Sequence, residues 1–313
     1  MNELINYNNG FTDGIGWHWP IAVYLLLAGI SGGALIVALA IRYYKNQSEN
    51  TAVYKSAALV SCSTILLGMV FLVADLTKPL VFWKILIYYN FSSVMSIGVA
   101  AISIYIPLTC VLVIYAFDKE IKSWFGFLSP IINLLNKLRG TVEGASFFFG
   151  VIICAYTGFL ISVLVRFPML NTSILPALFV VSGISAGTAA LCIVAKKGFK
   201  EDSHSSDMQI LHKIEWPIMF TEIMFLVMLY VSLLVGGAAG KNALAGFHSG
   251  AWADVFWFGV VGIGFTLPLF LNFMLGKKVA HSATVFYISA ISSIVGVLCL
   301  RLFIIYAGQI FSI

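Results

Sequence analysis

Eight long apolar runs dominate this sequence and restrict the folds that it can adopt. A helix needs about 20 mainly apolar residues to cross the hydrocarbon core of a bilayer. Apolar residues make up 60% of the chain and charged residues only 10%, which excludes an ordinary soluble domain. We therefore predict an all-α integral membrane protein with eight transmembrane helices. The predicted spans cover residues 19–41, 56–76, 93–115, 144–165, 174–195, 215–236, 252–275 and 283–310.

The longest connection between spans runs from about residue 116 to residue 143. Within it, residues 129–139 combine isoleucine and leucine with Lys137 and Arg139, so we expect a short helix lying in the membrane interface. The remaining connections are too short to form a soluble domain.

The distribution of lysine and arginine among the loops predicts the orientation of the protein. The loops after the first, third, fifth and seventh spans carry thirteen of these residues, whereas the opposite face carries four. Because cytoplasmic loops are rich in lysine and arginine, both termini are expected in the periplasm of a Gram-negative cell, with the protein in the inner membrane. The first run is long enough to span and lacks a basic segment before it, so we expect no cleavable signal peptide. The net charge of +5 is spread over short loops and forms no stripe, which argues against a nucleic-acid partner.

Two similar motifs, 154 residues apart, indicate an internal repeat. Residues 29–34 read Gly-Ile-Ser-Gly-Gly-Ala, and residues 183–188 read Gly-Ile-Ser-Ala-Gly-Thr. Each contains a G-x-x-x-G pattern, which is typical of close helix packing. Four helices per unit would give both units the same orientation, so we predict two side-by-side four-helix bundles in a parallel repeat. The first unit begins in residues 1–140, residues 141–172 supply its fourth helix, and residues 173–313 form the second unit.

Two ionisable residues are expected deep in the membrane, where burying a charge is costly. Glu222 lies about two turns into the sixth span, and Arg301 lies near or beyond the middle of the eighth. Such residues face a bundle interior or a cavity, and many serve in proton transfer. The alternative is a structural ion pair that ties two helices together.

A denser set of polar residues is expected in the outer half of the membrane. His18 begins the first span, Asp75 closes the second, Tyr156 lies in the fourth, and Arg166 follows that span. A quinone site needs a few hydrogen-bonding groups in an apolar slot. His18 and Tyr156 are candidates for its ring oxygens, Arg166 is a further candidate contact, and Asp75 is a candidate proton acceptor. The alternative is that the histidine and tyrosine are interfacial anchors.

The cysteines and histidines are poorly spaced for a metal cofactor. A b-type haem needs two histidines at equal depth on facing helices, and no histidine lies in the middle of a predicted span. Depth alone leaves a pairing of His18 with His248, or of His212 with His281, open. We predict no haem and no iron–sulfur cluster in this protein, so electrons taken from a quinol would leave to another subunit. The five cysteines, which stand singly within apolar runs, are Cys62, Cys110, Cys154, Cys192 and Cys299.

A series of motifs in order along the sequence resembles the NrfD/PsrC family of membrane subunits. The resemblance covers nearly the whole sequence and includes the Tyr-Thr-Gly at residues 156–158. The other matching segments are Trp17-His-Trp-Pro with the residues through Gly33, Leu76-Thr-Lys-Pro79, Phe82-Trp-Lys84, Ser93-Val-Met-Ser-Ile-Gly98, residues 174–179 with Ser182-Gly-Ile-Ser185, and Leu300-Arg-Leu-Phe-Ile-Ile-Tyr-Ala-Gly-Gln309.

The resemblance implies a subunit that oxidises menaquinol or a similar quinol near the periplasmic face. It implies electron transfer to a four-cluster iron–sulfur protein, and then to a terminal reductase of the nitrite or polysulfide type. By the resemblance, the residues that contact the quinone in the family correspond to His18 and Tyr156 in this sequence. Among relatives, a carboxylate and a histidine change places between the position of His18 and that of Asp75. One alternative is a proton-translocating or scaffold module without quinone turnover of its own, which Glu222 and Arg301 favour. The other is a solute transporter, which only the repeat suggests.

Overall fold

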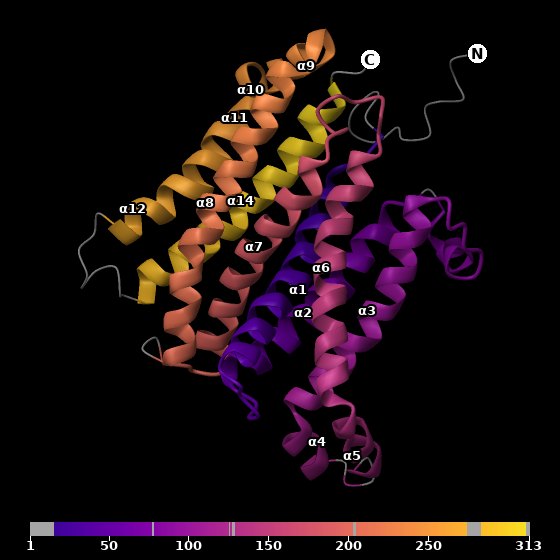
Figure 1. Ribbon diagram of the computed structural model, residues 1–313, viewed down its shortest axis with the longest axis vertical. Helices are drawn as coiled ribbons and strands as arrows, with labels where there is room; N and C mark the ends of the chain where they lie inside the picture. Colours follow the sequence, from indigo (N-terminus) through magenta and orange to yellow (C-terminus); the bar gives the residue numbers. More distant parts are fainter. Residues whose placement is uncertain are drawn as a thin grey trace.

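The computed structural model describes residues 16–310, apart from residues 77, 125, 127–128, 203–204 and 274–282. His281, Lys277 and Lys278 therefore lie outside the described residues. The described elements are all helical, and eight helices are long and apolar enough to cross a membrane (Figure 1). The predicted spans are confirmed. The spanning segments are α1 (Trp19–Tyr44), α2 (Ala52–Ala74), α3 (Val94–Ala116), α6 (Arg139–Ser162), α7 (Ile174–Gly198), α8 (Ser206–Val235), Ala251–Leu271, and α14 (Ala283–Ile310), in which the apolar span is Thr284–Ile310.

Helix ends differ from the predicted spans because helices continue past the apolar core. Thr51 caps α2 by accepting a hydrogen bond from the Tyr54 backbone N–H at 3.3 Å. Ser205 caps α8 in the same way, accepting from the Met208 N–H at 3.4 Å, so α8 begins nine residues before the predicted span at 215. Hydropathy indicates which part of a helix lies in the membrane, whereas capping residues decide at which residue the helix begins.

Shorter helices connect the spans. The seventh span is built from α11 (Ala251–Asp254), the π-helical segment η3 (Val255–Thr266) and α12 (Leu267–Phe273). The expected short helix appears as α5 (Ser129–Lys137), next to α4 (Asp118–Trp124), and Figure 1 shows both beyond the lower end of α6, while its place in the membrane interface stays a prediction. The remaining connections are η1 (Pro79–Leu86), α9 (Gly237–Ala243) and α10 (Ala245–His248).

The first helix is the core of the molecule. α1 packs against α2, α6, α7 and α14, and 83% of its most apolar window is buried within the protein. The other spans are less enclosed, at 28% to 61%. Membrane helices can associate without a hydrophobic driving force only where their surfaces fit closely. The fold is therefore organised around the fit of α1 to its neighbours.

Glycines allow α1 to meet α7 backbone to backbone, and they belong to the two similar motifs. A Cβ atom on Gly33 would stand 2.0 Å from the carbonyl oxygen of Gly183, and one on Gly187 would stand 2.4 Å from the Ala34 nitrogen. On another face of α1, a Cβ on Gly32 would stand 2.5 Å from the Gly150 carbonyl oxygen of α6. The packing interpretation of the G-x-x-x-G patterns is confirmed, because the two motifs pack against each other.

The arrangement in two side-by-side bundles remains a prediction. In the first half of the sequence, α1 contacts α2 and α6, and α3 contacts both of these helices. In the second half, α7 contacts α8 and α14, and α14 contacts η3. However, α1 packs as extensively on α7 as on α2, so the two halves share a tight interface.

Candidate functional site

His18 and Asp75 come together where α1 begins and α2 ends. His18 precedes α1 and Asp75 directly follows α2, and His18 Nδ1 lies 3.9 Å from Asp75 Oδ1. The side chains are 15% and 17% exposed. The other ring nitrogen, His18 Nε2, is buried and has no hydrogen-bond partner among the described residues. A buried ring nitrogen without a partner is unusual in a folded protein, so this atom is suited to hold a polar group of a ligand.

The surroundings of Asp75 favour a carboxyl group that can take up a proton. Partial burial raises the pKa of Asp75 above its ordinary value, and the nearby His18 opposes this by favouring the charged form. A carboxyl group with a raised pKa gains a proton more readily than an exposed one. The pair therefore combines a free ring nitrogen with a group that can accept a proton.

The end of α14 holds the segment that carries His18. Gln309 Oε1 accepts hydrogen bonds from the backbone N–H groups of Gly16 and Trp17, at 3.0 and 3.1 Å. Its Nε2 donates to the Trp17 carbonyl oxygen at 3.2 Å. One amide side chain thus satisfies three backbone groups and fixes the residue next to His18.

Tyr156 lies deeper in the protein, on α6. Its ring packs directly on the backbone of α3, because a Cβ atom on Gly98 would stand 1.7 Å from Tyr156 Cζ. The hydroxyl makes a long contact of 3.5 Å to the Met95 carbonyl oxygen, and the ring is buried. Tyr24 of α1 lies close enough to interact electrostatically with Tyr156. Tyr24 follows His18 by six residues, which places Tyr24 roughly 9 Å farther along α1 than His18.

The structure brings His18 and Asp75 together but does not join all four outer candidates. Tyr156 shares the α1, α3 and α6 interior with Tyr24, and no direct contact with the His18 pair is seen among the described residues. Arg166 is exposed beyond α6, with its guanidinium 5.9 Å from the ring centroid of Phe167. Of the four outer candidates, only His18 and Asp75 lie in direct contact, so a shared site with Tyr156 or Arg166 stays a prediction.

Arg301 and Glu222 lie in the interior of the second half of the protein. Arg301 is 0% exposed, and its Nη2 donates to Ser182 Oγ at 2.7 Å and to the Phe179 carbonyl oxygen at 3.3 Å. The guanidinium carbon stands 3.5 Å from the centroid of the Phe179 ring. Nε and Nη1 have no hydrogen-bond partner within the described part of the protein. Arg301 is therefore bonded to α7, with two donors left free.

Glu222 reaches the same region from α8. It is 2% exposed and faces the Ser185 hydroxyl and the charge of Arg301. Ser185 is in turn 3.2 Å from the Ser293 hydroxyl on α14. The carboxylate and the guanidinium thus share one polar interior, although the hydrogen bonds of Arg301 go to Ser182 and Phe179.

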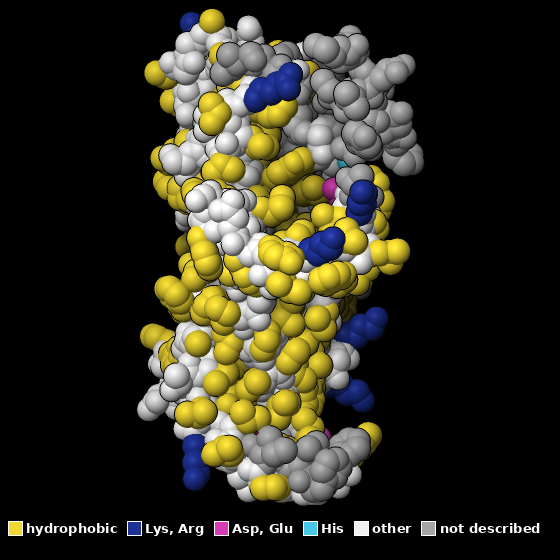
Figure 2. All heavy atoms as spheres, turned by 90° about the vertical axis from the view of Figure 1, so that its right-hand side faces the viewer, with side chains coloured by type: hydrophobic (Ala, Val, Ile, Leu, Met, Phe, Trp, Pro, Cys, Tyr) yellow, Lys and Arg dark blue, Asp and Glu magenta, His cyan; other side chains and the backbone are white. Residues whose placement is uncertain are grey.

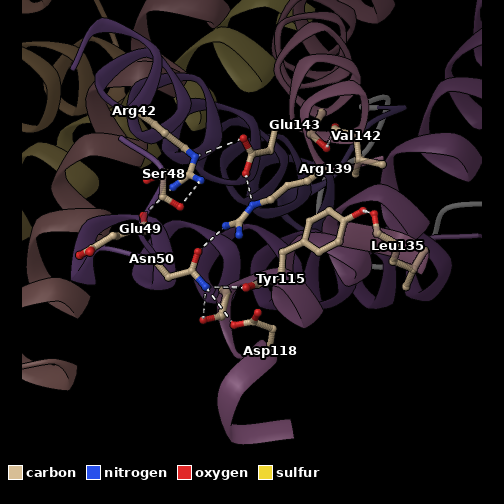
Figure 3. Close-up of polar contacts among 12 residues, drawn as sticks. Arg42, Ser48, Glu49, Asn50, Tyr115, Asp118, Leu135, Arg139, Val142 and Glu143 are labelled. Atoms are coloured by element: carbon tan, nitrogen blue, oxygen red, sulfur yellow. Dashed lines mark hydrogen bonds and ion pairs between the residues drawn. The ribbon is translucent and has the colours of Figure 1, made fainter. Parts of the chain in front are cut away.

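A buried cluster of charges joins the three helices α1, α2 and α6 at the end of the protein opposite His18 (Figure 3). The side chains of Arg42 and Arg139 both point at Glu143, with Nε to carboxylate distances of 3.2 and 2.9 Å. The Tyr54 ring lies under both guanidiniums, at 4.6 and 5.4 Å from its centroid. Both arginines counted only as loop charges in the sequence, so this cluster was not predicted.

Asn50 extends the cluster to α3. Its side-chain oxygen accepts from Arg139, and its Nδ2 donates to the Tyr115 carbonyl oxygen at 2.7 Å. The Tyr115 hydroxyl donates to the Leu135 carbonyl oxygen of α5 at 2.6 Å. Lys45 also pairs with Asp207 at the start of α8. These contacts place the basic loops after the first, third and fifth spans at one end of the protein.

The described residues offer no group of three histidine, cysteine or acidic side chains that could hold a metal ion. His248 Nε2 lies 3.0 Å from the Tyr230 hydroxyl, and His212 lies 3.9 Å from Glu215. His281 is outside the described residues, so its pairing with His212 stays untested. The spans and their polar interior define a multi-pass integral membrane protein with eight helices.

Comparison with known proteins identifies the family. The family model described as "Polysulphide reductase, NrfD" matches residues 8–313. The C subunit of polysulfide reductase from Wolinella succinogenes is 39% identical over 300 residues, which cover 94% of this protein and 95% of that subunit. Protein NrfD of Escherichia coli is 34% identical over 308 residues, covering 95% of this protein and 96% of that one. The protein belongs to the NrfD family, which confirms the resemblance seen in the sequence.

Two site residues were missed because their role depends on a neighbouring helix. Gly98 and Gln309 both occur in the segments that resemble the family, but neither was assigned a role. A glycine within an apolar helix indicates that another residue packs closely on the helix, but it does not indicate which residue that is. At Gly98 this residue is Tyr156. A glutamine at the end of a span signals a polar contact, which here is the Trp17 backbone.

Proposed function

We propose that this protein is the quinol-oxidising membrane subunit of a respiratory reductase complex. Its substrate is menaquinol or a similar quinol, which it oxidises near the periplasmic face. The electrons pass to a periplasmic four-cluster iron–sulfur subunit and then to a terminal reductase subunit of the nitrite or polysulfide type. The observation that carries the proposal is the buried Nε2 of His18, which has no hydrogen-bond partner among the described residues, while the other ring nitrogen faces Asp75. The similarity to the polysulfide reductase C subunit and to NrfD proteins supports the same assignment.

The chemistry requires groups that hold the quinol hydroxyls and accept two protons. Oxidation of one quinol to the quinone releases two electrons and two protons. His18 Nε2 accepts a hydrogen bond from one hydroxyl and takes its proton, and Asp75 relays that proton toward the periplasm. Tyr156 donates a hydrogen bond to the other ring oxygen, whose hydroxyl gives the second proton to water that reaches the site from the periplasmic face. The electrons leave to the iron–sulfur partner because we assign no haem and no cluster to this protein.

The proposed location is the inner membrane, with both termini in the periplasm. The basic loops gathered around Arg42, Arg139 and Lys45 then face the cytoplasm, as lysine-rich and arginine-rich loops do. This orientation puts His18 and Asp75 at the periplasmic end, where an outside electron acceptor can approach.

Replacing Tyr156 by phenylalanine is expected to slow quinol oxidation without unfolding the protein. The change removes only the hydroxyl, which makes no more than a 3.5 Å contact within the protein. A lost hydrogen bond to the substrate costs about 1–3 kcal/mol, which corresponds to a roughly five- to 150-fold lower rate. The measurement is quinol-dependent reduction of the partner's iron–sulfur clusters in the assembled complex.

Tyr43→Phe is the matched control, because Tyr43 is an exposed tyrosine at the end of α1 opposite His18. Gly98→Ala is a second probe, since its methyl group would displace the Tyr156 ring. Both Tyr156→Phe and Gly98→Ala should lower the rate while Tyr43→Phe does not. Unchanged rate and quinol affinity in Tyr156→Phe would remove Tyr156 from the site.

The activity is expected to fall at acidic pH through the titration of Asp75. Only the carboxylate form can accept a proton, and burial raises the pKa of Asp75, so this form is lost at a higher pH than for an ordinary aspartate. Rates should therefore rise with pH through that pKa and level off above it. Asp75→Asn should lower the plateau about 100-fold or more and abolish this limb of the pH profile. If the rate of Asp75→Asn still fell at acidic pH as the rate of the parent protein does, the titrating group would be another residue.

A second proposed function is proton transfer through Glu222 and Arg301. The specific observation is a fully buried guanidinium, two nitrogens of which have no partner among the described residues, together with the buried Glu222 carboxyl group on the neighbouring helix α8. Ionisable groups at such depth frequently belong to proton pathways. In this proposal the complex moves protons across the membrane during turnover, with Glu222 as the carrier.

Glu222→Gln is expected to abolish proton movement while leaving the complex assembled. The amide keeps the shape of the side chain but cannot release a proton. The measurement is acidification by the complex in vesicles, with Glu215→Gln as a control on the same helix. If Arg301→Ala prevents assembly and Glu222→Gln restores it, the two residues form a structural pair instead.

A further inference from the structure

The segment that follows Asp75 exposes an unusual run of large apolar side chains. Residues 79–91, which contain η1, have no buried residue within the 3-10 helix. Leu80 is 90% exposed and Ile87 is 61% exposed. The other exposed large apolar residues of this segment are Val81, Phe82, Trp83, Leu86, Tyr88, Tyr89 and Phe91. Water would solvate this surface poorly, so something apolar must cover it.

The position of the segment limits what can cover its apolar side chains. The backbone leaves α2 at Ala74 and begins α3 at Val94, so both ends of the segment are fixed at the outer ends of two spans. Figure 1 shows it extending sideways from the upper end of α3, away from the other helices. A segment that runs sideways from the ends of two spans stays at the level of the membrane surface.

The apolar surface of the segment continues into surfaces that face lipid. Leu66, Leu67 and Val70 are exposed on α2, and Met95 and Ile97 are exposed at the start of α3. These side chains lie within spans, so lipid tails cover them. Figure 2 looks onto this side and shows a mainly hydrophobic face, with lysine or arginine side chains at a few points.

The composition of the segment matches the boundary between lipid tails and head groups. Aromatic rings and lysines are enriched at this level, where rings lie among the upper tails and lysines reach the phosphates. The charged side chains of the segment and its start are Lys78 and Lys84, and Lys84 Nζ lies 5.9 Å from the centroid of the Trp83 ring. A docking surface for a soluble protein would instead need a polar rim around a small apolar centre.

We propose that residues 79–91 lie at the periplasmic interface of the inner membrane, with phospholipid as their binding partner. The apolar side chains enter the upper acyl region, while Lys78 and Lys84 reach lipid phosphates. Because Pro79 follows Asp75 by four residues, the segment also fixes the His18 and Asp75 pair at head-group depth. The proposal does not depend on quinol oxidation, so it can be tested without turnover.

Spin labels on the segment provide the test. Leu80→Cys and, separately, Ile87→Cys are introduced into the full-length protein with its native cysteines replaced by serine or alanine. Each labelled protein is reconstituted in vesicles of phosphatidylethanolamine and phosphatidylglycerol, and the accessibility of the label to oxygen and to a water-soluble nickel chelate is measured. Tyr44→Cys is the matched control, since Tyr44 is 84% exposed at the end of a span and is followed by a polar loop.

The expected result is that oxygen reaches the labels at positions 80 and 87 better than nickel does, and that the Tyr44→Cys label shows the reverse. Two labelled positions guard against local misfolding at one of them, because both must report the same depth. Nickel access above oxygen access at both positions would overturn the proposal. Nickel access that disappears only in the assembled complex would assign the surface to a protein partner, which also overturns it.

Discussion

Gly33→Ala is expected to prevent accumulation of the folded protein in the membrane. The added Cβ would stand 2.0 Å from the Gly183 carbonyl oxygen and 2.8 Å from the Ile184 Cα. Both are backbone atoms of α7, so no change of rotamer relieves the clash, and α1 and α7 must separate. Overpacking ordinarily costs about 1–3 kcal/mol, and a backbone clash in the most enclosed helix is expected to exceed this range. The measurements are the yield in the membrane fraction and the thermal unfolding midpoint in detergent.

Gly144→Ala is the matched control for this substitution. Gly144 also lies within a membrane helix, but a Cβ there would meet only the Tyr43 hydroxyl, at 3.9 Å. Because alanine favours helix over glycine by about 1 kcal/mol, this variant should be at least as stable as the parent. A Gly33→Ala protein with normal yield and midpoint would show that α1 and α7 do not touch as described.

Glu143→Ala is expected to cost about 3–5 kcal/mol of unfolding free energy, because it leaves two guanidiniums without their shared carboxylate. The Arg42 and Glu143 side chains are only 7% and 6% exposed, so water cannot replace the lost contacts. The ion pair between Arg42 of α1 and Glu143 of α6 is lost at the same time. Thermal unfolding in detergent, followed by loss of the monodisperse species, measures the effect.

Glu120→Ala tests whether burial is the cause of this loss. Glu120 pairs with Lys55 at 2.6 Å, but its side chain is 50% exposed, and Lys55 lowers the pKa of Glu120 through their hydrogen bond. Exposed pairs are worth about 0–1 kcal/mol, so this variant should unfold nearly as the parent does. Equal losses in both variants would mean that the inner cluster is no more important than a surface pair.

The sequence was sufficient to predict the spans, because lipid imposes a length and a composition on each helix. It also predicted close packing at the two glycine motifs, but not that Gly33 and Gly183 are each other's partners. Hydropathy reports how a helix meets lipid and carries little information on which helix lies beside it. For the same reason Arg42 and Arg139 were counted as loop charges, although both are bonded to Glu143.

The candidate site was predicted in part. His18 and Asp75 were both expected in the outer half of the membrane, because one begins an inward span and the other ends an outward span. Their direct contact was not predicted and comes from the structure. Depth along a helix follows from counting residues, which is why Tyr156 was placed in the outer half. The direction of a side chain around the helix does not follow from depth. The contact of Gly98 with Tyr156 was therefore not predicted, and the role of Arg166 stays a prediction.

The central position of α1 has a consequence for how the protein is made. α1 reaches the membrane first during synthesis, yet α7, which covers its glycine face, is made only after α2, α3 and α6. Until then the seam from Gly29 to Gly33 faces lipid or the insertion machinery, without the backbone contact that the finished protein provides. Final assembly must therefore wait for the second half of the sequence. In a polypeptide that stops before α7, the glycine face of α1 would stay uncovered, and membrane quality control can recognise such an incomplete protein.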